Sequence, residues 1–200
     1  MKKIAAKLIL VLLVAEMLLT LLSWILSVVA TEAVHTLLSD EGMRWLFGGF
    51  VERTCSPLLL WLMLLSMAYG VLSASGSLIR SPQQSSLSVE EYRHRLARRL
   101  SIAAVLFFVT LIAVLSFVPH AILLSATGSV YSSPFSRAAV PLLVLALTLY
   151  GFVYGFTART FTTWTDFCSA LFDGLANGAP LILCYIVLKQ FVDSLLFVFA

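Results

Sequence analysis

The sequence predicts an all-α membrane protein: four transmembrane helices plus a C-terminal re-entrant hairpin or fifth broken helix, with a short interfacial helix in the first outer loop. Of its 200 residues 60% are hydrophobic, and the mean hydropathy is +1.01, whereas only about half of a soluble domain is apolar. Four apolar stretches are also long enough to cross a hydrocarbon core of about 30 Å at about 1.5 Å per residue.

The four expected spans belong to one polytopic domain over residues 1–200 and cover residues 8–30, 58–79, 101–118 and 138–157. Three lysines precede the first span, so a cleaved signal peptide is one possibility there. The apolar run is longer than the core of a signal peptide, and the rest of the chain is itself polytopic. A retained signal-anchor helix therefore fits better.

The basic residues predict the orientation of the helices. With the N-terminus in the cytoplasm, nine of the thirteen Lys and Arg are cytoplasmic: Lys2, Lys3, Lys7, Arg80, Arg93, Arg95, Arg98, Arg99 and Arg159. The positive-inside rule thus predicts a multi-pass protein of a bacterial-type cytoplasmic (inner) membrane, with a cytoplasmic linker over residues 80–100. The net charge of +3 is mostly this topology signal, and no nucleic-acid partner is expected.

The first outer loop contains the pattern of a short amphipathic helix. Ser39 is a candidate N-cap, and the two acidic residues after it favour the positive end of a helix dipole. Apolar residues then recur on one face: Met43, Leu46, Phe47 and Phe50. We expect this helix either to lie in the interface, with Trp45 among the headgroups, or to pack over neighbouring spans, and to end at Gly48 and Gly49.

The second outer loop is rich in Ser, Gly and Pro and predicts irregular structure up to the fourth span, where Pro141 falls in the first turn. That span contains Gly151 and Gly155, spaced so that another helix can approach closely. They are candidates for a packing or dimer face.

The segment from Asp166 to Ala200 predicts a hairpin or a broken helix. Its first arm is too polar and too short to cross a membrane, and Gly178 and Pro180 interrupt it. Twenty mainly apolar residues follow, with Lys189 and Asp193 four residues apart, so that the two can pair on one face. Irregular backbone is allowed at membrane depth where protein or water surrounds it.

Four charged residues at or near membrane depth are the candidate ion-coupling groups: Glu16, Asp173, Lys189 and Asp193. An unpaired Glu16 inside the first span would be costly, so we expect it to be protonated or to face a partner. It is either a proton-relay group or, as a structural alternative, a helix-contact or snorkelling residue.

Catalytic templates find no support in the sequence. The histidines are expected on opposite sides of the membrane, His35 and His120 outside and His94 inside, and no motif for a metal, nucleotide or nucleophile is present. The three cysteines are scattered, so we expect inert buried thiols: Cys55, Cys168 and Cys184. The chain is not expected to be an enzyme, and no cofactor or metal is expected.

Several motifs occur in an order that resembles the p-aminobenzoyl-glutamate transporter (AbgT) family. They are "LLSDEGMRWLF" at 37–47, "LSVEEYRHRLARRLS" at 87–101, "SSPFSRAAVPLLVLALTLYGFVYGFTARTF" at 132–161 and "KQFVDSL" at 189–195. The resemblance implies a dimeric secondary transporter that moves p-aminobenzoyl-glutamate or sulfonamide-type compounds with a cation or proton gradient.

The chain also departs from that family. Between the helices that correspond to residues 58–79 and 101–118, members carry a re-entrant hairpin and discontinuous helices, where this chain has only the linker. Members also carry further core helices beyond the position of Ala200. No transport residue of the family has a matching position here. What remains resembles the family's scaffold and dimerisation helices.

Two functional hypotheses follow. The first is a scaffold or interaction subunit that forms a homo-oligomer or pairs with another membrane protein. The second is a minimal, oligomeric, ion-coupled secondary transporter of p-aminobenzoyl-glutamate-like or sulfonamide-like anions, with Glu16, Asp193 and Lys189 as its polar groups. An inactive, degenerate product is the third possibility, although the ordered spans indicate that the chain still inserts into the bilayer.

Overall fold

The structure is a computed structural model that describes residues 2–29, 35–78, 89–117 and 134–199. Over these residues it contains helices and no strands, and five helices are long and apolar enough to cross a membrane by length and composition: α1 (Lys2–Val29), α4 (Pro57–Ala74), α5 (Val89–Phe117), α6 (Pro134–Thr157) and α7 (Trp164–Phe199). Two short helices, α2 (Asp40–Gly48) and α3 (Phe50–Thr54), connect α1 to α4. The predicted all-α membrane class is confirmed.

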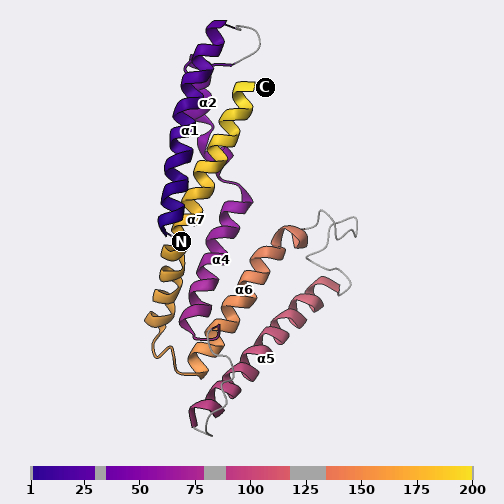
Figure 1. Cartoon of the computed structure of the whole chain (residues 1–200). Coiled ribbons are helices and arrows are strands. Elements are labelled where there is room, and N and C mark those ends of the chain that lie inside the picture. The colour runs from indigo at the N-terminus through magenta and orange to yellow at the C-terminus, as the bar shows by residue number, and fades with distance from the viewer. Residues whose placement is uncertain (1, 30–34, 79–88, 118–133, 200) are drawn as a thin grey trace. The chain divides into compact units, whose positions relative to one another are not determined.

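The single domain expected from the sequence divides into two compact units. Unit 1 is Met1–Met63 with Gly178–Ala200, and unit 2 is Leu64–Asn177, so α4 and α7 contribute to both. Within unit 1, α1 runs beside the C-terminal half of α7, and within unit 2, α5 runs beside α6 (Figure 1).

The C-terminal segment is one helix and not a hairpin, so the re-entrant alternative is wrong for it. α7 is continuous for 36 residues with Pro180 inside it, and the fifth helix predicted as broken is therefore unbroken. A proline inside a helix removes one backbone hydrogen bond, and a membrane helix tolerates that loss. The expected break instead coincides with the boundary between the two units at Gly178.

The linker expected over residues 80–100 is partly helical. From Val89 onward it forms the first turns of α5, because this stretch has many helix-forming Glu, Arg and Leu residues and no Gly or Pro. The rest of that linker, and residues 118–133 of the expected irregular outer loop with His120, lie outside the described residues.

The helix predicted in the first loop is present as α2. The Ser39 hydroxyl accepts a hydrogen bond from the Gly42 amide at 3.1 Å, and the helix ends at Gly48, after which α3 begins. The Trp45 ring stacks on Phe197 of α7, with centroids 4.5 Å apart. Trp45 is therefore a packing residue, as in the second of the two alternatives for this helix.

Unit 1 has a small core where the first loop meets α1 and α7. Leu19, Leu37 and Val198 are buried together. The buried hydroxyl of Ser23 accepts from the Leu37 amide at 3.3 Å, and the His35 amide donates to the Val198 carbonyl at 3.2 Å. These bonds hold the end of the loop against both helices and so fix where α2 begins.

Unit 2 depends on close contact between α4 and the first half of α7. A Cβ atom added to Gly174 would lie 2.5 Å from the Ser66 carbonyl oxygen and 2.8 Å from the Gly70 Cα atom, and one added to Gly70 would collide with the backbone at Ala170 and Gly174. Only two glycines allow the backbones to come this close.

The glycines singled out in α6 also face neighbours within unit 2. A Cβ atom on Gly151 would lie 2.8 Å from Val71 of α4, and one on Gly155 would collide with the ring of Phe161. Val71 and Phe161 form a buried cluster with Phe167 and Ala170 of α7. Both glycines therefore pack against other parts of the same chain.

α5 contacts the rest of unit 2 through α6. Ala97 of α5 is buried against Tyr154 and Ala158 of α6, and the Tyr154 hydroxyl lies 3.3 Å from Nδ1 of His94. The outward surface of α5 is apolar and exposed, with Phe107 72% exposed.

We predict that Gly174→Ala destabilises the protein. The added methyl group meets backbone atoms that cannot rotate away, and overpacking of this kind costs about 1–3 kcal/mol. Thermal unfolding in mild detergent measures the effect. Gly48→Ala is the matched control, because nothing lies within 4 Å of a Cβ atom there. Equal melting temperatures for the two variants would contradict the close contact.

A second prediction concerns Arg159, which ends α6 in the left-handed conformation with φ 59°. Arg159→Gly should raise the free energy of unfolding by about 1 kcal/mol relative to Arg159→Ala, because both variants lose the charge and only glycine adopts this φ freely. Chemical denaturation of the two variants side by side measures the difference. A glycine variant no more stable than the alanine variant would show that the backbone relaxes at this position.

Candidate functional site

A polar contact joins the first and last spans of unit 1. The Ser194 hydroxyl of α7 donates to Oε1 of Glu16 on α1 at 2.6 Å, across 178 residues of sequence. Ser194 is fully buried and Glu16 is half-buried. The hydroxyl uses its one hydrogen in the bond to Glu16. Its oxygen accepts the hydrogen bond that Nε2 of Gln190 donates at 3.3 Å.

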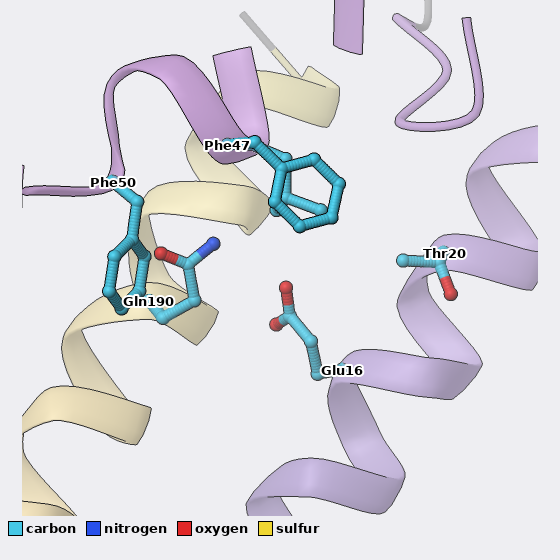
Figure 2. Close-up of a pocket in the computed structure, with 6 residues that line it drawn as sticks. Glu16, Thr20, Phe47, Phe50 and Gln190 are labelled. Atoms are coloured by element: carbon cyan, nitrogen blue, oxygen red, sulfur yellow. The ribbon is translucent and has the colours of Figure 1, made fainter. Parts of the chain in front are cut away.

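The Glu16 carboxyl group borders a pocket of about 430 Å³. Its lining comes from α1, α7 and the first loop: Glu16, Thr20, Leu46, Phe47, Phe50 and Gln190. Figure 2 shows the carboxyl group projecting from α1 toward α7, with the Gln190 amide across from it and the Phe47 and Phe50 rings bordering the space. The pocket is therefore mainly apolar, with a few polar atoms at one side.

Lys189 and Asp193 form an ion pair one turn apart on α7. The Lys189 ammonium donates to Oδ1 of Asp193 at 2.5 Å, and Asp193 is buried while Lys189 is about one-third exposed. Pairing at this spacing lowers the cost of holding both charges in an apolar surrounding. Ser194, the residue after Asp193, brings Glu16 to the same stretch of α7.

Three buried oxygen atoms around this stretch have no hydrogen-bond partner within the described part of the chain: Oε2 of Glu16, Oε1 of Gln190 and Oδ2 of Asp193. Each can only accept a hydrogen bond when the carboxylates are ionised. A buried acceptor without a partner is costly, so these atoms are places where a ligand or water would be stabilised.

The other predicted residues lie elsewhere. Asp173 is exposed on α7 in unit 2, so it does not share the unit that holds Glu16, Lys189 and Asp193. The three cysteines are free thiols, but Cys55 is exposed and Cys168 and Cys184 are only half-buried, so the expectation of three buried thiols is wrong. The position of Cys55 directly after α3 places it in a short connection between helices. Among the described residues, no cluster of three His, Cys, Asp or Glu side chains could hold a metal.

Sequence reasoning missed Ser194 and the aromatic side of the pocket. Gln190 and Ser194 stand four residues apart on α7, which places them on one face, and this spacing was the available signal. Nothing in the sequence shows that Glu16 faces them. Phe47 and Phe50 were recognised as part of an apolar face, but their use as a pocket wall depends on how α2 and α3 pack.

Ser194→Ala should destabilise the protein by about 1–3 kcal/mol, because it leaves both Oε1 of Glu16 and Nε2 of Gln190 without a partner in a buried place. Thermal unfolding in detergent measures the loss. Ser27→Ala on α1 is the control, since that hydroxyl bonds only the carbonyl of Trp24 in its own helix. A loss no greater than that of the control would argue against the contact.

Comparison with known proteins places the chain in a family. The model of the AbgT putative transporter family matches residues 79–199, which is more than half of the chain and contains α5, α6 and α7. No curated protein and no solved structure matches the sequence. The family match agrees with the five apolar helices of the structure. The chain therefore belongs to the AbgT transporter family and is a multi-pass, all-α membrane protein.

Proposed function

We propose that this protein is a scaffold or interaction subunit of the inner membrane that forms oligomers or pairs with another membrane protein, with its N-terminus in the cytoplasm. The observation that carries the proposal is the contrast within unit 2. Its centre is filled by glycine contacts and aromatic rings, while α5 packs against α6 and presents large apolar side chains outward. A closely packed unit with an exposed apolar helix surface suits association inside a bilayer.

The alternative is a minimal ion-coupled transporter of p-aminobenzoyl-glutamate-like or sulfonamide-like anions, assembled from several copies. The contact between Glu16 and Ser194 beside a pocket favours it, because intramembrane carboxyl groups that face a cavity commonly serve ion or proton transfer. Asp193 and Lys189 would supply the neighbouring charges. Alternating access would also require a moving element around that pocket.

Cysteine cross-linking tests the scaffold proposal. In a background with Cys55→Ser, Cys168→Ser and Cys184→Ser, we expect Phe107→Cys on the outward surface of α5 to cross-link in membranes, either to a second copy or to a distinct membrane protein. Ala97→Cys on the same helix is the control, because that position is 0% exposed beneath α6. Monomeric protein with no adduct at position 107 would contradict the proposal.

Transport measurements then separate the two functions. For a scaffold, the purified protein in liposomes gives no gradient-driven flux of p-aminobenzoyl-glutamate. The transporter alternative is supported instead if the protein alone gives flux that is lost in Glu16→Gln or Asp193→Asn. That flux should be kept in Asp173→Asn of unit 2.

A further inference from the structure

The polar atoms of the unit 1 pocket that lack a hydrogen-bond partner are acceptors, which neither proposed function explains. Oε2 of Glu16 and Oε1 of Gln190 are buried and have no partner among the residues that the structure describes. The Gln190 nitrogen donates one hydrogen bond to the Ser194 hydroxyl, and the Thr20 hydroxyl donates to the Met17 carbonyl at 2.7 Å. A ligand that satisfies this pocket must therefore bring hydrogen-bond donors.

The charge of the pocket is also uncompensated. Within the described residues the Glu16 carboxylate is bonded only by the neutral Ser194. The nearby cations are engaged elsewhere, since Lys189 pairs with Asp193, and Arg53 lies over the Trp45 ring at 3.7 Å and donates to the Leu46 carbonyl. A carboxylate in an apolar surrounding is costly unless a positive charge accompanies it. A cation in the pocket would offset that cost.

The remaining lining suits a flat apolar body. Phe47 and Phe50 border the space, and Phe47 is 71% exposed, so its ring has a free face (Figure 2). Aromatic faces attract cations and stack on other rings. A volume of about 430 Å³ lies within the range of about 300–1,000 Å³ that holds small organic ligands.

We propose that this pocket binds an aromatic organic cation that carries N–H donors, with the donors at Glu16 and Gln190 and the ring system against Phe47 and Phe50. This inference does not rest on the scaffold proposal. The proposed cation also differs in charge from the anions of the transporter alternative. An anion would meet a carboxylate and an unpartnered amide oxygen, and the unpartnered buried donor Nε of Arg53 lies outside the pocket lining.

Ethidium is the probe that tests the site, since it is a flat aromatic cation with two amino groups. The full-length protein in mild detergent is titrated, and binding is followed by fluorescence anisotropy with protein-free micelles subtracted. Glu16→Gln keeps an oxygen that can accept from Ser194 but removes the charge, so we expect affinity to fall about tenfold or more. Glu52→Gln, the same change at an exposed position of α3 outside the pocket lining, should leave affinity unchanged.

A second variant and two further probes also test the site. Phe47→Leu changes a side chain that is 71% exposed, and it should weaken ethidium binding about threefold or more through the lost ring contact. If Glu16→Gln does not fold, the Phe47→Leu variant alone tests the binding site. Uncharged phenanthridine and the anion p-aminobenzoate should bind more weakly than ethidium. Equal affinities of Glu16→Gln and Glu52→Gln, an unchanged Phe47→Leu, or p-aminobenzoate binding as tightly as ethidium would overturn the proposal.

Discussion

The structure depends on one constraint: an apolar surrounding offers no water to the polar groups of the chain, so a polar group left without a partner is costly. Helices satisfy the backbone locally. Four hydroxyl groups on the spans donate to carbonyls three or four residues earlier in their own helix: Thr20 on α1, Ser73 on α4, Thr110 on α5 and Thr148 on α6. A carboxylate has no proton to donate in this way, which explains why Glu16 reaches a different helix.

The two units meet this constraint by different means. Lipid is as apolar as a leucine side chain, so close packing and specific polar contacts hold membrane helices together in place of the hydrophobic effect. Unit 2 uses close packing, with Gly70 against Gly174 and Gly151 against Val71. Unit 1 uses contacts between side chains, such as Ser194 with Glu16 and Trp45 with Phe197. The pocket lies in unit 1.

The family match and the pocket overlap only in part. The match begins at residue 79, so it contains Gln190 and Ser194 but not Glu16, Phe47 or Phe50. Family membership therefore says little about what the pocket accepts, and its chemistry must be derived from the atoms that line it. Those atoms are acceptors beside aromatic rings, which is why we assign it a cation although the resemblance implies anionic substrates.

Sequence alone determined the features that depend on local composition and period. Four of the apolar helices, the Ser39 cap, the end of α2 at Gly48 and the pairing of Lys189 with Asp193 all follow from residues within a few turns of one another. The likeness to the AbgT family was visible in ordered motifs, and the match over residues 79–199 bears it out. The hairpin was predicted wrongly because Gly178 and Pro180 resemble a break, whereas the helix continues through Pro180 with the loss of one backbone hydrogen bond.

Only the tertiary structure decided which distant residues meet. No pattern within α4 or α7 indicates that Gly70 faces Gly174, because each glycine becomes a contact only once the two helices cross at that height. Glu16 and Ser194 lie 178 residues apart, and their hydrogen bond depends on the rotation of two helices about their axes. Local period determines which face of a helix a residue occupies, whereas the neighbour that the face meets depends on packing across the whole chain.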